Sequence, residues 1–470
     1  MMSDRADYAR FLSRLALYER FEPFPRTRGP EKLAGVRRLA AELEHPERAC
    51  RVVHVAGTNG KGLTAAMIAR LLVRAGRRTG LYTSPHVADI RERITLEGAP
   101  VPEAVFARAG HRVLDVADRL RASLHFSYFD LLTLIAWEAF RAESMDWAVL
   151  ETGLGGLSDA TNIAPKELCV LTRIGLDHLH VLGDTLEAIA AQKLGIVTPG
   201  VPTVLAEQPA GLEPWLRARL AERDSAVSAA GAFRLELPRP GAGRLEGRWT
   251  DGAPLGLPLA GDAPRLSPPA LACAANALAA GELLLGPAEG EERPARLAAA
   301  LETRLPGRLE LRRAQRLPVP GAAGPSPLDT VVLDTVVLDG GHNPDAVAAL
   351  VAQLARWGLS DYTLVLSLQS DKLVKPLAPP LRELLTGAAR VLALAPRTPR
   401  APSPEVLRAF LAPLQPAGRP APETVAGPLE ALLAAAEAPG RPVVVTGSFW
   451  MVGDVINLLE RGASREGAGG

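Results

Sequence analysis

The strongest constraint on the fold is an alternation of short apolar runs with longer segments of helical periodicity. In the first half of the chain the short runs end in glycine or in polar residues: "RVVHVAG", "TGLYTS", "DWAVLETG", "LCVLTRIG" and "VPTVLAE". Short apolar runs separated by helices are typical of a mostly parallel sheet that is covered on both faces. We therefore predict an α/β fold.

The length of the chain, 470 residues, is too great for one core and favours two domains. Residues 226–262 contain short alternating pieces broken by glycine and proline, which predict a small β excursion. The segment "GPAEGEERPAR" is the best linker, so we place the boundary near residue 295 and expect domains at 1–295 and 296–470.

The second domain repeats the α/β pattern with "VVLDTVVLDGG", "YTLVLSL", "RVLALAP" and "RPVVVTGS", which predicts a smaller Rossmann-like domain. Within it, "LDTVVLDTVVLD" at 328–339 repeats after five residues. Because such a repeat places each side chain on the opposite face of a sheet, the sequence leaves the register of this strand open. The tail "GASREGAGG" is expected to be mobile.

Charge and cysteine content limit the classes of partner. The 53 Lys and Arg nearly balance the 52 Asp and Glu, so we expect no nucleic acid and no anionic membrane as partner. The N-terminus is not a signal peptide, and no run is judged apolar for long enough to cross a bilayer. Cys50, Cys169 and Cys273 lie in apolar contexts without a CxxC pair, which predicts buried free thiols in a cytosolic protein.

The segment "HVAGTNGKGLTAAMIARLL" combines a strand, a glycine-rich turn and an amphipathic helix. This is the context of a phosphate-binding loop, in which Gly57 and Gly60 let the backbone approach the anion and Lys61 reaches the outer phosphates. The match to G-x-x-x-x-G-K-[ST] is partial, since Val55 and Gly62 replace the first glycine and the hydroxyl residue. An ordinary strand-to-helix turn is the alternative.

Two further strand ends carry polar residues. Glu151 ends an apolar strand, where open α/β sheets bind ligands, and a carboxylate there can hold magnesium beside nucleotide phosphates. Asp177 and His178 follow the next strand, and Lys193 lies on the helix after it. Each residue alone has a structural explanation, but together they predict a site at one sheet edge.

The residues resemble a known family. The motifs "HVAGTNGKG", "GLYTSPH", "GLGG" followed by "DATN", "IGLDH", "LGDTLEAIAAQKLGIV", "PGRLE", "DGGHNPDA" and "VTGSFWMVGDV" occur in the order seen in bacterial folylpolyglutamate synthases and dihydrofolate synthases, of the Mur ligase superfamily. The resemblance runs from about residue 30 to residue 458.

This resemblance implies a P-loop ATPase domain followed by a Rossmann-like ligase domain. It implies that ATP phosphorylates a folate or dihydropteroate carboxylate and that the amine of L-glutamate attacks the acyl phosphate. The expected protein is a cytoplasmic monomer that uses ATP and magnesium and acts on these small molecules.

The resemblance also implies roles for residues. The triphosphate is cradled by the loop of Gly57, Thr58, Asn59, Gly60, Lys61 and Gly62. Ser84 and Glu151 resemble ligands of a first magnesium ion; Glu151, His178 and Lys193 resemble the site of a second, with Lys193 carbamylated. Asn276, Arg308 and Asp339 match positions that contact ATP, and His342 matches one that faces the amino acid. The expected catalytic residues are Lys61, His178, Lys193 and His342.

Four positions depart from the family pattern. Leu63 replaces a hydroxyl residue, Leu157 an arginine, Asp130 a glutamate and Gly341 an alanine. One alternative is a ligase of another small carboxylate, such as a cell-wall precursor, and Leu63 and Leu157 leave open a nucleotide-binding protein without catalysis. The sequence does not separate a folylpolyglutamate synthase from a bifunctional enzyme, because dihydropteroate recognition depends on the loop "FEPFPRTRGPEKL".

Overall fold

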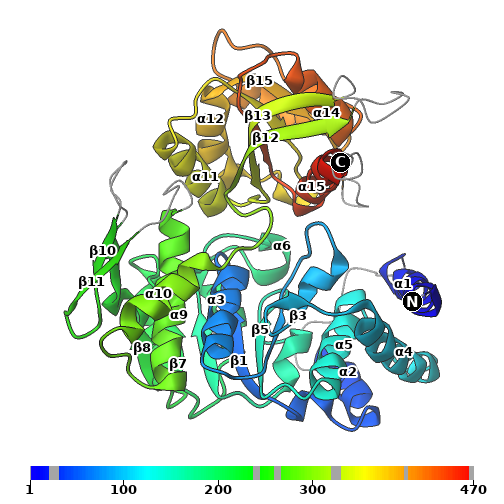
Figure 1. The fold of residues 1–470 in the computed structure, drawn as a ribbon, viewed down its shortest axis with the longest axis vertical. Helices are drawn as coiled ribbons and strands as arrows, with labels where there is room; N and C mark the ends of the chain where they lie inside the picture. The colour runs from blue at the N-terminus through cyan, green and yellow to red at the C-terminus, as the bar shows by residue number, and fades with distance from the viewer. Residues whose placement is uncertain are drawn as a thin grey trace. The chain divides into compact units, whose positions relative to one another are not determined.

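The computed structural model describes residues 2–20, 31–236, 244–258, 266–318, 330–395 and 401–464. It has the predicted α/β architecture, in two compact units (Figure 1). The first contains residues 1–175, 182–260 and 268–304, and the second contains 176–181, 261–267 and 305–470. The boundary expected near residue 295 falls within helix α10 (Glu292–Glu302), which belongs to the first unit.

The first unit is built on an eight-stranded sheet of order β4-β3-β2-β5-β1-β6-β7-β8. The six strands β2-β5-β1-β6-β7-β8 pair with their neighbours in parallel. At the other edge, β3 pairs antiparallel with both β2 and β4. All the predicted strands of the first half are present, and the carboxyl ends of β1, β5 and β6 lie side by side. The bounds are β1 (Arg51–Ala56), β2 (Thr79–Tyr82), β3 (Ile94–Leu96), β4 (Ala99–Pro100), β5 (Trp147–Glu151), β6 (Leu168–Leu171), β7 (Thr203–Leu205) and β8 (Val227–Ala229).

Helices cover this sheet and supply a core rich in aromatic side chains. Trp137 and Phe140 of α5 are fully buried and meet in a T-shaped contact, and Phe11 of α1 packs in the same way on Phe106 of α4. The helices are α1 (Met2–Arg20), α2 (Glu31–Glu42), α3 (Lys61–Arg74), α4 (Glu103–Leu120), α5 (Tyr128–Ala142), α7 (Leu186–Leu194), α8 (Leu212–Ala221) and α9 (Pro268–Leu285).

Helix α9 corrects one expectation. By length and composition this helix could cross a membrane, whereas from the sequence we expect no run that is long and apolar enough. In the fold, however, α9 packs along α3, and more than half of it is buried inside the protein. A buried core helix passes the same test of length and hydropathy, so its apolar character is explained by packing.

The stretch expected to form hairpins contains a three-stranded antiparallel sheet of order β11-β10-β9. The strands are β9 (Arg234–Glu236), β10 (Arg244–Arg248) and β11 (Pro254–Pro258). Trp249 anchors this sheet, because its ring makes a T-shaped contact with Phe233 and its Nε1–H donates to Glu282 of α9 at 2.5 Å. The parts of this stretch at 237–243 and 259–262 lie outside the described residues.

The second unit contains a six-stranded sheet of order β12-β13-β17-β14-β15-β16, in which only the pairing of β12 with β13 is antiparallel. The helices of this unit are α11 (Pro344–Arg356), α12 (Ala378–Thr386), α13 (Pro404–Leu411), α14 (Pro428–Ala436) and α15 (Phe449–Ser464). Helix α6 (Leu179–Leu182) crosses the division between the two units. The strands are β12 (Glu310–Pro318), β13 (Thr330–Asp339), β14 (Tyr362–Leu366), β15 (Ala388–Ala393), β16 (Glu423–Thr424) and β17 (Val443–Thr446).

The register left open by the five-residue repeat is resolved in β13. The first copy, residues 330–334, pairs only with β12, whereas the second copy, residues 335–339, also pairs with β17. Asp334 is consequently exposed, while Asp339, at the same place in the second copy, is buried. Neighbouring strands thus give identical local sequences different environments. Residues 328–329 of the repeat, and residues 465–470 of the tail expected to be mobile, lie outside the described residues.

Candidate active site

The glycine-rich loop after β1 depends on its glycines. Gly57 has φ +155°, and a Cβ there would lie 1.8 Å from the Thr172 hydroxyl oxygen, so no side chain fits. Gly60 has φ +82° and caps the start of α3. The backbone N–H of Thr58 donates to the Arg173 carbonyl at 2.9 Å, which ties the loop to the end of β6. The loop therefore presents the N-terminus of a helix, as anion sites do.

Lys61 and Lys193 both donate to carbonyl groups of this loop. Lys61, the first residue of α3, is half-buried, and its Nζ donates to the Thr58 carbonyl at 3.2 Å. Lys193, in the last turn of α7, is only 4% exposed, and its Nζ donates to the Gly57 carbonyl at 2.6 Å. A lysine is rarely buried to this extent in a protein unless its charge is paired.

Glu151 places a buried carboxylate beside the first turn of α3. It is 4% exposed, and its Oε2 accepts the backbone N–H of Ser84 at 2.9 Å. A Cβ on Gly62 would lie 2.9 Å from the same oxygen. This packing explains why glycine stands where a phosphate loop usually has a hydroxyl residue, since the carboxylate needs the space.

Helix α9 brings Asn276 to the same region of the first unit. One turn earlier, the Cys273 thiol contacts the Gly60 carbonyl at 3.5 Å, so this side of α9 faces the loop. Asn276 is 3% exposed, and its Oδ1 has no hydrogen-bond partner among the described residues. Buried polar atoms are nearly always satisfied, so this open acceptor fits a site for a polar ligand.

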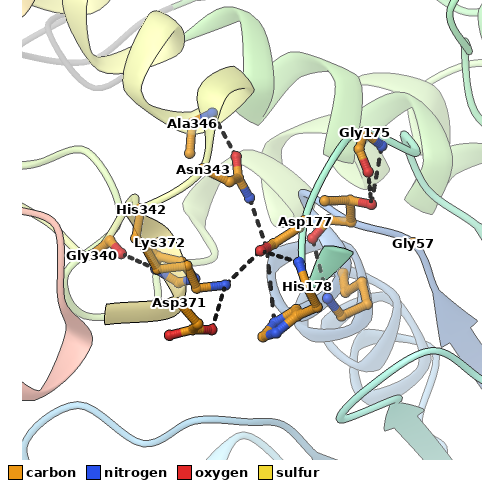
Figure 2. A network of polar contacts seen from close by, with 12 residues as sticks. Gly57, Gly175, Asp177, His178, Gly340, His342, Asn343, Ala346, Asp371 and Lys372 are labelled. Carbon is orange, nitrogen blue, oxygen red and sulfur yellow. Dashed lines mark hydrogen bonds and ion pairs between the residues drawn. The ribbon is translucent and has the colours of Figure 1, made fainter. Parts of the chain in front are cut away.

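In the second unit a polar network surrounds Asp177 (Figure 2). Its carboxylate accepts the His178 backbone N–H at 2.8 Å, the Lys372 ammonium at 2.5 Å and the Asn343 amide at 3.2 Å. Burial raises the pKa of the Asp177 carboxyl, but His178 and Lys372 outweigh it and hold this pKa well below its ordinary value. The same residues, with His342 and Asp371, line a small pocket that is partly open to solvent.

The His342 imidazole is set up to be neutral. Burial and the Lys372 ammonium lower its pKa below the ordinary value. Its Nδ1 lies 2.8 Å from the Gly340 carbonyl, and because a carbonyl only accepts, Nδ1 carries the proton in this bond. The Nε2 atom is then the basic nitrogen of His342.

Arg308 and His342 share a contact, the ring of Phe449. The Arg308 guanidinium lies 4.7 Å from the ring centroid, and the His342 ring makes a T-shaped contact with the Phe449 ring at a centroid distance of 5.9 Å. A Cβ on Gly340 would collide with the same ring at 2.2 Å. Phe449 therefore fixes the directions of two of the predicted site residues.

Asp339 ends β13 and is buried. Its two carboxylate oxygens accept the backbone N–H groups of Leu309 at 2.9 Å and Gly341 at 2.8 Å. Burial raises the pKa of Asp339 to about 6, even though these bonds and Arg308 lower it. A Cβ on Gly341 would lie 2.4 Å from its Oδ1, so glycine makes room for this carboxylate.

The predicted residues thus form two groups, one in each unit. The first unit brings together residues 57–62, Ser84, Glu151, Lys193 and Asn276; the second contains His178, Arg308, Asp339 and His342. Within the described ranges no three His, Cys, Asp or Glu side chains form a cluster that could hold a metal ion by themselves. Glu151 is a carboxylate that could hold magnesium together with a nucleotide's phosphates, which is how this ion is commonly bound.

Sequence reasoning missed Lys372, Asn343 and Phe449. Lys372 closes the short 3₁₀ turn Ser370–Lys372 after β14, and Asn343 caps α11 by accepting the Ala346 N–H at 3.0 Å. Ligands in parallel sheets bind beyond the carboxyl ends of strands, so the residues after "YTLVLSL" and "VVLDGG" carried a usable signal.

The departures from the family pattern have local explanations in three cases. Asp130 forms a capping box with Ser127 at the start of α5, a role that a shorter acid fulfils. The loop at Leu157, an exposed side chain, is held by its backbone, since its N–H donates to the Gln192 carbonyl at 2.8 Å and its carbonyl accepts Asn162 at 3.2 Å. Gly341 accommodates Asp339. Nothing in the structure explains Leu63.

Comparison with known proteins decides the family. Folylpolyglutamate synthase of Lacticaseibacillus casei is 31% identical over 451 residues, which cover 91% of this chain and 94% of that protein. The chain belongs to the folylpolyglutamate synthase family. It is an enzyme of the ATP-dependent ligase class to which that family belongs.

Further relatives support the same family. Dihydrofolate synthase/folylpolyglutamate synthase of Bacillus subtilis (strain 168) is 38% identical over 185 residues, covering 38% of this chain and 43% of that protein. The solved structure of Mycobacterium tuberculosis folylpolyglutamate synthase complexed with ADP has a TM-score of 0.79 at 26% identity and covers 97% of this chain and 99% of that one. No sequence-family model matches the chain.

Proposed function

We propose that this enzyme uses ATP to join L-glutamate to the carboxylate of a folate or of dihydropteroate. A carboxylate is a poor electrophile, so the γ-phosphate of ATP is transferred to it and the glutamate amine displaces phosphate from the acyl phosphate. One observation carries the proposal: Lys193 buries its amine 2.6 Å from the carbonyl of Gly57, the first glycine of a phosphate-type loop. The relatives named above provide the substrate class.

The first unit supplies the phosphate site. The N–H groups of residues 57–62 and the Lys61 ammonium would neutralise charge on the triphosphate, and the open acceptor of Asn276 would meet a donor of the nucleotide. The Glu151 carboxylate and the Ser84 hydroxyl would hold magnesium, which supplies charge neutralisation at the phosphates when bound. The Ser84 N–H donates to the Glu151 carboxylate, and that carboxylate lies beside Gly62 of the loop.

Lys193 takes part in this site as a carbamate. An ammonium cannot ligate a cation, but once Nζ has lost a proton it can add carbon dioxide and release a second proton, which leaves an N–H that bears a carboxylate. That N–H can still donate to the Gly57 carbonyl, while the new oxygens are available to a metal ion. His178 is a further proposed metal ligand.

The second unit receives the amino acid and handles its proton. The neutral His342 has a basic Nε2 that can accept a proton as the amine attacks. Arg308 and Asp339 would contact the nucleotide. We further propose that the enzyme is a soluble cytoplasmic monomer.

The first experiment measures ADP release by the purified protein with ATP, magnesium and L-glutamate. Dihydropteroate and tetrahydrofolate are compared as acceptors, and Lys193→Ala is the control. Turnover with either acceptor that is lost in the variant supports the ligase and shows which reaction it performs. ATP binding without turnover on either acceptor would instead favour a diverged substrate or a binding protein.

Carbamylation has its own readout. Incubation with ¹³C-labelled bicarbonate should give a carbamate signal in the NMR spectrum of the wild-type protein that is missing from Lys193→Ala. A signal unchanged by the substitution would contradict the assignment.

A further inference from the structure

His178 is held in a left-handed backbone conformation, which is uncommon for a residue with a side chain. Its φ is 51°, and such conformations outside glycine persist where the surroundings enforce them, often at functional sites. The Asp177 carboxylate contacts this residue twice. Its Oδ1 accepts the His178 N–H at 2.8 Å, and its Oδ2 lies 3.9 Å from Nε2 of the ring.

Asp177 is itself held by two residues that are distant in sequence. Lys372 Nζ donates to Oδ1 at 2.5 Å, and the two side chains are only 6% and 11% exposed. Asn343 donates from Nδ2 to Oδ2 at 3.2 Å, and its amide is oriented because Oδ1 caps α11. Figure 2 shows these contacts converging on the carboxylate. Removing one partner of such a buried ion pair leaves an uncompensated charge.

We propose that Lys372 is a positioning residue that acts through Asp177 to set the backbone and ring orientation of His178. Lys372 reaches the carboxylate, and the carboxylate reaches both the N–H and the imidazole of His178. The inference rests on the proposed function, in which His178 takes part in the phosphate-transfer site. Hydrogen-bonded carboxylates commonly orient such histidines.

The test is a double-mutant cycle with Lys372→Met and Asp177→Asn. If Lys372 acts only through Asp177, each variant lowers kcat by about 10- to 100-fold, and the double variant loses no more than the worse single one. The KM for ATP and for L-glutamate should change by less than about twofold, because neither substrate loses a direct contact. Lys375→Met is the matched control, since Lys375 is an exposed lysine of the same segment.

A second readout does not depend on turnover. In protein with ¹⁵N-labelled histidine, the ring signals of His178, identified among the eight histidines by His178→Ala, should shift in Lys372→Met and not in Lys375→Met. Should Lys372→Met fail to fold, Asn343→Asp replaces it. That variant keeps the oxygen that caps α11 but sets a negative group against Asp177.

The outcomes are distinct. A raised KM for L-glutamate at unchanged kcat would make Lys372 a direct substrate contact and overturn the proposal. The proposal would also be overturned if the losses in kcat multiplied in the double variant, or if the ring signals of His178 were unchanged in Lys372→Met. Wild-type protein that releases no ADP with any acceptor would instead contradict the proposed function, and the histidine spectra would then decide the positioning role alone.

Discussion

Gly62 and Glu151 compete for one small volume beside the phosphate-type loop. The carboxylate oxygen lies 2.9 Å from where a Cβ on Gly62 would be, and that carboxylate is buried, so it has little room to retreat. A methyl group at position 62 therefore displaces the acid, while leaving the helix intact. The glycine serves the site and not the stability of α3.

We expect Gly62→Ala to lower kcat/KM by about 100-fold, the loss that a displacement of about 1 Å can cause in a catalytic group. The free energy of unfolding should be unchanged or higher by up to about 1 kcal/mol, because alanine favours a helix more than glycine does. ADP release and urea unfolding measure the two effects. Gly211→Ala, at a helix start with open space, is the control; equal activity in both variants would contradict the argument.

Asp339 and Asp334 occupy the same place in two copies of one pentapeptide, but only Asp339 is buried. Burial raises the pKa of Asp339 from 3.8 to about 6, so the folded protein binds this proton more tightly than the unfolded chain does. The proton's contribution to stability is complete below about pH 3.8 and is lost as the pH rises through about 6.

Relative to Asp339→Asn, the wild-type protein should therefore lose about 2.4 kcal/mol of unfolding free energy between pH 4 and pH 7, from a pKa difference of about 2.2. Urea unfolding of both proteins across this range measures the difference. The matched control is Asp334→Asn, at the exposed position of the first copy. A wild-type curve parallel to that of Asp339→Asn would show that Asp339 titrates normally.

The start of α15 links two site residues through one ring. Phe449 contacts the Arg308 guanidinium and the His342 imidazole, which come from the segment before β12 and the loop after β13. Leucine at this position keeps most of the apolar volume but removes the π face that attracts the guanidinium. The helix end, the loop and the turn before β12 are thus coupled by a single side chain.

We expect Phe449→Leu to raise the KM for ATP and the KM for L-glutamate by about two- to fivefold each, the effect of losing a partly exposed cation–π contact. Phe449→Tyr keeps the ring and should behave as the wild type. Steady-state kinetics with each substrate varied in turn measures both constants. A lower melting temperature with both KM values unchanged would mean that the ring only stabilises the fold.

The sequence predicted the secondary-structure elements better than it predicted the contacts between residues that are distant in the chain. Apolar runs predicted β1, β5 and β6, and the rule for parallel sheets gathered Glu151 and the phosphate-type loop at one edge. The approach of Lys372 to Asp177 joins residues far apart in the chain, and no local pattern reports such a contact. In β13, two identical pentapeptides differ only because β17 pairs with the second, so local sequence could not assign the burial of Asp339.

Two separate cores distinguish the units of the molecule. In the first, Leu134 of α5 belongs to a core around Trp137, and in the second, Leu384 of α12 belongs to a core between the sheet and its helices. Both leucines are fully buried. Units with their own sheet and core can unfold independently, so a single melting temperature need not describe this chain.

Differential scanning calorimetry should accordingly show two transitions. Leu134→Ala and Leu384→Ala each create a cavity worth about 2–5 kcal/mol, and each should lower the transition of its own unit while leaving the other in place. Val406→Ala, at an exposed position, is the control and should move neither. If one transition shifts equally in both cavity variants, the units unfold as a single cooperative body, because a cavity in one core then lowers the stability of the whole chain.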